Sequence, residues 1–259
     1  MLSRQAGAVA AATVLLAVAC GTGGNGSRAA NPPSGMTHGA AAESSSRGSP
    51  YRPAIDRSRF RTVVDNAWFP LKPGTTFLYR GVKDGEPSRD VYAVTGQTRT
   101  IDGAPCVVVH DSLYLSGSLA EETYDYYTQD LQGNVWYFGE DTKELNEKGE
   151  VTSTEGTWHA GVDGAQPGIF MEANPGVGHR YRQEYYRGQA EDQYRVVSLS
   201  TPITVPYGSF QTAQLTEEWT ALEPETLDHK YYVRGIGEVA ELSVRGPQER
   251  ALLVSVTAG

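Results

Sequence analysis

Cysteine, methionine and basic side chains are scarce in this sequence of 259 residues. It contains two cysteines, three methionines, and 22 Lys and Arg against 31 Asp and Glu, for a formal net charge of -9. The acidic balance argues against a nucleic-acid partner, because neutralising phosphates needs a basic surface. With so few cysteines, the stability of the fold must come from its core.

The sequence also lacks the common motifs of catalysis and cofactor binding. It has no Gly-x-Ser-x-Gly elbow, no His-Glu-x-x-His pair, no glycine-rich loop ending in Lys-Ser or Lys-Thr, and no full acidic calcium loop. The five histidines occur singly, so a metal site would need them to converge in space. We therefore predict no cofactor and no metal, and we favour a binding protein over an enzyme.

The first 19 residues have the organisation of a secretion signal. Arg4 precedes an uncharged run of about 14 residues, shorter than the roughly 20 needed to cross a hydrocarbon core. The small residues directly before Cys20 resemble a bacterial lipobox, which predicts a lipid on Cys20; the alternative is an ordinary cleaved signal. Residues 20–56, rich in Gly, Ser, Ala, Asn and Pro, predict a disordered tether. We expect a lipid-anchored protein on the extracytoplasmic side of a bacterial cell envelope.

Residues 57–259 form a single predicted β domain, because β-branched and aromatic residues alternate between Gly, Pro, Asp and Asn breaks. A short helix or turn is predicted only at Glu140–Glu150. Cys106 lies in an apolar run, which predicts a buried, inert thiol. Strands are predicted at residues 75–80, 89–100, 106–115, 121–129, 134–138, 180–187, 192–200, 211–221, 228–234, 238–245 and 250–256.

The strands fall into two similar series. Gly and Tyr-Tyr anchors recur at an offset of 104 or 105, which predicts an internal repeat of residues 74–138 and 178–245 with a long connection at 139–177. The fold class is therefore all-β and mainly antiparallel, with few short helices. Two five-strand meanders plus a closing strand predict one large curved sheet or open barrel.

Three segments of the chain resemble uncharacterised secreted bacterial lipoproteins. They are residues 66–74 (NAWFPLKPG), 133–141 (GNVWYFGED) and 230–237 (KYYVRGIG). The family implies no function that can be carried over. The Tyr-Tyr-x-x-Gly-x-Gly ending of the third segment is also similar to half-open barrels of the lipoprotein-carrier (LolA/LolB) type. That likeness implies a concave sheet that shelters an acyl chain or another hydrophobic ligand.

Two sets of residues are candidates for a functional site. Aromatic strands and a long connection favour a carrier for an apolar or amphipathic ligand, with these ligand-binding residues: Trp68, Trp136, Phe138, Trp158 and Met171. The alternative is a carboxylate-dependent hydrolase of cell-envelope glycans that uses Glu155 and Asp163, since paired carboxylates perform that chemistry. A third possibility is a structural module that docks to another envelope protein.

Overall fold

A computed structural model describes residues 51–259. The predicted signal peptide, Cys20 and most of the predicted tether lie outside the described residues. The strands are β1 (Phe60–Arg61), β2 (Thr76–Lys83), β3 (Glu86–Ile101), β4 (Ala104–Leu115), β5 (Ser118–Asp130), β6 (Val135–Leu145), β7 (Val151–Ser153), β8 (Trp158–His159), β9 (Gln166–Met171), β10 (Arg180–Arg182), β11 (Glu184–Tyr185), β12 (Asp192–Val205), β13 (Gly208–Thr220), β14 (Leu227–Val233), β15 (Gly237–Arg245) and β16 (Glu249–Thr257).

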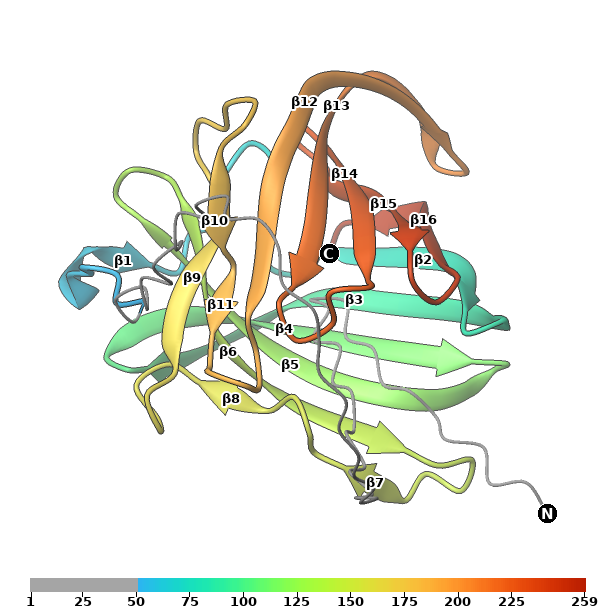
Figure 1. The fold of residues 1–259 in the computed structure, drawn as a ribbon, viewed down its shortest axis with the longest axis horizontal. Helices are drawn as coiled ribbons and strands as arrows, with labels where there is room; N and C mark the ends of the chain where they lie inside the picture. The colour runs from blue at the N-terminus through green and yellow to red at the C-terminus, as the bar shows by residue number, and fades with distance from the viewer. Residues whose placement is uncertain (1–50) are drawn as a thin grey trace, which may run out of the picture.

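Thirteen of these strands follow one another in a single barrel-like antiparallel sheet (Figure 1). The path runs β10-β12-β13-β14-β15-β16-β2-β3-β4-β5-β6-β9-β11. Its first and last strands are separated in the sequence by Gln183 alone, so both ends of the path lie on one segment of the chain. The sheet therefore comes close to complete closure around an interior.

The architecture confirms the predicted fold class. Strands β2 to β6 are five consecutive antiparallel neighbours, and β10 with β12 to β15 are five more. The last strand, β16, pairs with β15 on one side and with β2 on the other, so it joins the two meanders. Helix is limited, in residues 51–259, to the 3-10 turn η1 (Arg57–Arg59), and no helix there is long and apolar enough to cross a membrane.

Tight turns set the register of the first meander. The connections after β2, β3 and β4 are the two-residue turns Asp84-Gly85, Asp102-Gly103 and Ser116-Gly117. Both residues of each turn have positive φ, between 46° and 93°. This geometry is the type I′ turn, whose twist matches that of the strands it joins. Side chains two residues apart share a face within the regular stretches of β2 to β5, which are interrupted by register shifts at Val94/Thr98 and Leu113/Tyr114.

The helix considered for Glu140–Glu150 is wrong. Residues 140–145 continue β6 and pair with β5, and a turn at Asn146 to Gly149 leads into β7. The physical reason is that Glu140 and Thr142 point to the interior while Asp141 and Lys143 point outward, which is the period of two of a strand. The long connection at 139–177 also contains strands β7, β8 and β9, of which β9 carries the sheet onward to β11.

Aromatic rings fill one end of the interior. Phe69 contacts Phe170 at a centroid distance of 4.5 Å and Tyr127 edge-on at 5.4 Å, and Tyr127 stacks on Tyr137 at 4.8 Å. Phe69 comes from the segment before β2, so the N-terminal part of the domain closes this end. Offset and edge-on contacts are the arrangements that ring quadrupoles favour. We call the rings of Phe69, Tyr92, Tyr127, Tyr137 and Phe170 the aromatic floor.

Candidate functional site

Carboxyl side chains form a continuous series on the interior face of the first meander. Each of the strands β3 to β6 contributes one, Asp90, Asp111, Asp125 and Glu140, and β11 contributes Glu184. Asp125 lies directly opposite Glu140 in the β5–β6 register, and Asp90, Asp111 and Asp125 are diagonal neighbours on adjacent strands. Glu184 lies one strand further along, because β9 separates β11 from β6. We call these five residues the acid ladder.

The acid ladder has few hydrogen-bond donors. The Tyr137 hydroxyl donates to Oδ1 of Asp125 at 2.7 Å, and the Thr142 hydroxyl donates to Oε2 of Glu140 at 3.0 Å. Within residues 51–259, no N–H or hydroxyl donates to Oδ2 of Asp125, to Oε1 of Glu140, or to either carboxyl oxygen of Asp111. Buried oxygens without donors are costly when charged, so the ladder needs protons or a cation.

Burial shifts the titration of these acids upward. It raises the pKa of Asp125 from 3.8 to about 7, against the hydrogen bond from Tyr137. Burial, with the charges of neighbouring acids, raises the pKa of Asp111 and of Glu140 well above their usual range. Burial also raises the pKa of Asp90. Burial therefore opposes ionisation of these four acids, so each charged carboxylate costs free energy unless a donor or a cation compensates it.

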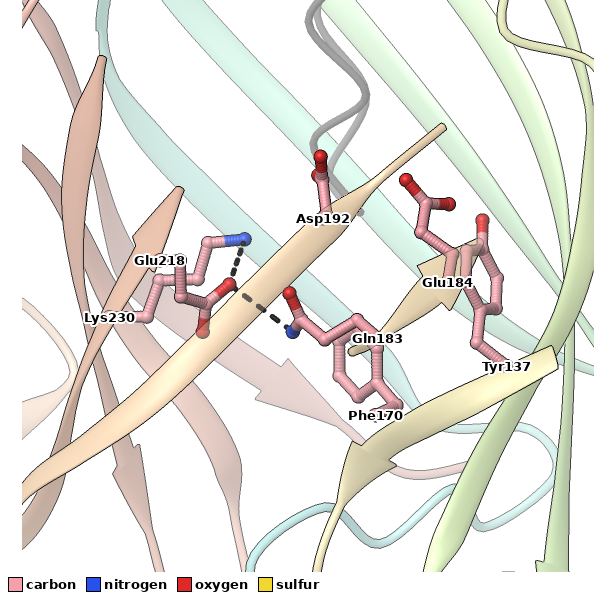
Figure 2. Close-up of a pocket in the computed structure, with 7 residues that line it drawn as sticks. All are labelled: Tyr137, Phe170, Gln183, Glu184, Asp192, Glu218 and Lys230. Atoms are coloured by element: carbon pink, nitrogen blue, oxygen red, sulfur yellow. Dashed lines mark hydrogen bonds and ion pairs between the residues drawn. The ribbon is translucent and has the colours of Figure 1, made fainter. Parts of the chain in front are cut away.

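The opposite wall carries the cation Lys230. Its side chain is only 2% exposed, and its Nζ lies 3.4 Å from Oε2 of Glu218 and 3.6 Å from Oε1 of Glu241. Burial lowers its pKa, but the surrounding carboxylates outweigh burial and raise it overall. Figure 2 shows Lys230 and Glu218 on one side of the interior, with Gln183 bridging to Glu218, and Glu184 on the other. Lys230 therefore already forms ion pairs with Glu218 and Glu241 on its own side of the interior.

Three small pockets adjoin in this interior. The first and second share Asp192, Glu218 and Lys230; Phe170 and Glu241 connect them to the third. Their lining contains one cationic side chain, Lys230, and these seven acids: Asp90, Glu184, Asp192, Glu218, Asp228, Glu238 and Glu241. The room left for the centres of water molecules is about 10, 20 and 30 Å³. Since one water needs about 10 to 15 Å³, each pocket holds about one to three waters.

The third pocket combines acids with aromatic rings, and we call it the aromatic–acid pocket. Its walls are Phe69, Tyr79, Tyr92 and Phe170 with Asp90, Glu238 and Glu241. Burial raises the pKa of Glu238 to about 8, against the attraction of Lys230, which lies on the neighbouring strand and also contacts Glu241. Ring faces and carboxylates both attract cations, and an organic ammonium is the group that uses both.

Two of the predicted ligand-binding residues border the interior. Trp158 is buried, meets the Tyr137 ring edge-on at 5.5 Å, and lies close enough to Glu184 to lower the pKa of that acid against the larger effect of burial. Met171 is buried at the end of β9, where its sulfur lies 3.4 Å from the side-chain amide of Gln214. Neither side chain lines the three pockets.

The other three predicted residues are placed elsewhere. Trp136 and Phe138 lie on the opposite face of β6 from Tyr137, and Phe60 of β1 packs edge-on against both at 5.8 and 5.2 Å. The Trp136 indole donates to Oδ2 of Asp130 at 2.9 Å. Trp68 is buried beneath the guanidinium of Arg234, 4.2 Å from its ring centroid. These three aromatic side chains pack between the barrel-like sheet and the N-terminal segment and do not line the three interior pockets, and their role in ligand binding stays a prediction.

The two acids of the hydrolase alternative are exposed. Glu155 lies in the turn after β7, where its charge contributes, after burial, to the raised pKa of Glu144. Asp163 lies in the turn between β8 and β9 with a positive φ of 49°. Neither lines the interior pockets. The hydrolase alternative stays a prediction without a cavity at either residue.

The acid ladder was missed in the sequence, although a signal for it existed. In β4, Asp111 follows Val107 and Val109 at intervals of two, so it shares the apolar face of its strand. In β5, Asp125 is related in the same way to Tyr127. An acid at a core position of a strand is rarely buried without a partner, so each was an indication of an interior polar site.

In residues 51–259, no group of three or more His, Cys, Asp or Glu is arranged to hold a metal ion.

Comparisons with known proteins find similar structures but no relatives by sequence. No family model matches the chain, and no curated protein matches it. A protein of YmcC-like fold from Bacteroides fragilis, described as a candidate exported protein, aligns at a TM-score of 0.43 with 14% identity over 74% of this chain and 99% of its own. A candidate lipoprotein from Parabacteroides distasonis aligns at 0.39 with 13% identity over 74% of this chain and 100% of its own. The first is described as exported and the second as a lipoprotein. Neither concerns the carrier-type half-open barrels.

Proposed function

We propose that this chain is an extracytoplasmic, lipid-anchored binding protein whose interior holds the cationic group of an organic ammonium ligand. The observation that carries the proposal is the aromatic–acid pocket, where four aromatic rings and three carboxyls surround one space. The anchor rests on the lipobox-like sequence before Cys20. Binding is the assigned role because the site has recognition groups but no nucleophile next to a base.

Charge balance favours a cationic ligand over an apolar one. The lining of the three pockets has seven acids and one lysine, and that lysine already contacts Glu218 and Glu241. An acyl chain would supply neither donors nor positive charge to these carboxyls, so they would stay in their protonated form. An ammonium group would supply the missing donors and charge, and its alkyl hydrogens would lie against ring faces. An amphipathic ligand fits this proposal when its polar end is an amine.

The size of the interior favours a small group. About 30 Å³ for water centres corresponds to two or three water molecules, which is on the scale of methylammonium. The alkyl chain of a longer amine would not fit in this pocket. It would have to extend out of the interior by displacing side chains that now fill the space around the pocket.

The proposal is tested by titrating methylammonium into the full-length chain and following binding by calorimetry and by chemical shifts of the aromatic rings. The double variant Asp90→Asn and Glu238→Gln removes two carboxylates of the pocket while keeping side-chain size. We expect binding in the wild type and at least tenfold weaker binding in the variant.

Two controls sharpen this experiment. Glu155→Gln removes an exposed acid and is expected to bind methylammonium like the wild type. Acetate, an anion of similar size, is expected not to bind in the interior. The absence of methylammonium binding, or equal binding by the wild type and the double variant, would contradict the proposed function.

A further inference from the structure

Besides the three interior pockets, another pocket lies on the outer face of the first meander, away from the acid ladder. In the register of β2, β3 and β4, Arg80 lies directly opposite Arg89, which lies directly opposite Tyr114. Arg80 follows Tyr79, whose side chain is buried, so the alternation of the strand turns Arg80 to the outside. The Arg89 guanidinium carbon lies 3.8 Å from the centroid of the Tyr114 ring.

The two arginines have no carboxylate partner. Among residues 51–259, neither forms an ion pair or a side-chain hydrogen bond, whereas most other arginines of the sheet do. Like charges directly opposite each other across two strands destabilise the pair. In a chain with a formal net charge of -9, two facing arginines without acids are an unusual local concentration of positive charge. An anion placed between them would remove the repulsion.

The arginines border an open pocket with room for such an anion. The space available to water centres is about 620 Å³, and the other lining residues are Gly81, Pro87, Ser88, Ser116 and Gly117. Gly81 allows the close approach of β16, because a Cβ there would lie 1.5 Å from the carbonyl oxygen of Arg250. Two guanidinium groups therefore border one open pocket on the outer face of the sheet.

We propose that this outer pocket, which we call the arginine pocket, binds a phosphate group. Guanidinium groups donate in pairs to phosphate oxygens, and stacking on Tyr114 fixes the plane of Arg89 so that its N–H edge stays free. A tetrahedral phosphate has enough oxygens to accept from both arginines. One acid is near: Oε2 of Glu86 accepts a hydrogen bond from the Ser116 hydroxyl at 3.0 Å, which holds that carboxylate at the turn end of the pocket.

The phosphate can come from free phosphate compounds or from a phospholipid headgroup, and two probes distinguish these sources. Inorganic phosphate is titrated into the full-length chain while backbone amide shifts of Gly81, Ser116 and Gly117 are followed. Vesicles of phosphatidylglycerol and of phosphatidylcholine are compared by co-sedimentation, because only the first adds net negative charge.

The test variant is Arg80→Gln with Arg89→Gln, and its control is Arg59→Gln with Arg187→Gln, which removes two exposed arginines elsewhere. We expect binding of inorganic phosphate, of phosphatidylglycerol vesicles, or of both to fall at least tenfold in the test variant and to stay within twofold in the control. Thermal unfolding without ligand checks that both variants fold; removing the facing charges should leave the melting temperature equal or higher.

Two results would overturn the inference: no binding of either probe by the wild type, or equal loss in the test and control variants. The second would show that only net charge matters. Because the arginine pocket and the aromatic–acid pocket lie on opposite faces of the sheet, methylammonium binding should be unchanged in the arginine variant. Failure of either proposal therefore leaves the other standing.

Discussion

Replacing Asp125 by Asn should remove part of the pH dependence of folding. In the folded protein the pKa of Asp125 is raised from 3.8 to about 7, chiefly by burial. The folded state therefore keeps a proton that the unfolded state loses near pH 4. The contribution of Asp125 to the free energy of unfolding is constant below about pH 4. It falls as the pH rises towards 7, because the unfolded state binds fewer protons than the folded state over that range.

The size of the effect follows from the shift. About three pKa units at about 1.4 kcal/mol each give an upper limit of about 4 kcal/mol. Asn keeps the shape of the side chain, and its carbonyl oxygen can accept the hydrogen bond that the Tyr137 hydroxyl now donates at 2.7 Å. We expect Asp125→Asn and the wild type to be similarly stable below pH 4, and the variant to be more stable above pH 7 by up to about 4 kcal/mol.

Urea unfolding of the full-length chain between pH 4 and 9 measures this difference. Asp163→Asn, which removes an exposed acid in a turn, serves as the control and should follow the wild-type profile. If the stability difference between Asp125→Asn and the wild type did not grow between pH 4 and 7, or if Asp125→Asn were less stable than the wild type at pH 8, the raised pKa of Asp125 would be refuted.

Three further predictions concern the contact between β2 and β16, the packing of Trp136 against Phe60, and the ligand. Gly81→Ala should destabilise the fold by about 3 kcal/mol, because the new Cβ would lie 1.5 Å from the Arg250 carbonyl oxygen. Gly96→Ala is the control, because open space surrounds Gly96, and urea unfolding should show no such loss of stability for it. Trp136→Ala should cost about 3 to 5 kcal/mol by opening a cavity under Phe60, with methylammonium affinity unchanged in calorimetry; a lost affinity in a folded variant would return Trp136 to the ligand site. Methylammonium should bind more tightly at pH 8 than at pH 6, because the cation favours the ionised form of Glu238, whose pKa is about 8. Calorimetry in buffers of different ionisation enthalpy should detect the released protons, and an affinity independent of pH would count against the interior site.

The sequence predicted the strands well because alternation is a local property. Several predicted ends were too early: the strand expected at 134–138 continues as β6 to Leu145, and the strand expected at 192–200 continues as β12 to Val205. The single strand expected at 180–187 is divided into β10 and β11. The period of two also placed Trp136 and Phe138 correctly on one face. It could not say which face is the interior, because that depends on β1, where Phe60 covers the outside of β6.

The acid ladder depends on information that no single strand contains. Each of its carboxyls comes from a different strand, and they become neighbours only through the register that the turns impose. Closure through β10 and β11 adds Glu184 from a segment 44 residues after Glu140. Burial then turns five separate acids into one site with raised pKa values, which composition and spacing do not reveal.

The most direct test of the interior cation site is the position of bound methylammonium. Intermolecular nuclear Overhauser effects should connect its methyl protons with the ring protons of Tyr79 and Tyr92 in the full-length chain, because both rings line the aromatic–acid pocket. Contacts to these two rings, lost in the Asp90→Asn and Glu238→Gln double variant, are the predicted result. Contacts only to exposed residues, or none at saturating methylammonium, would contradict the account.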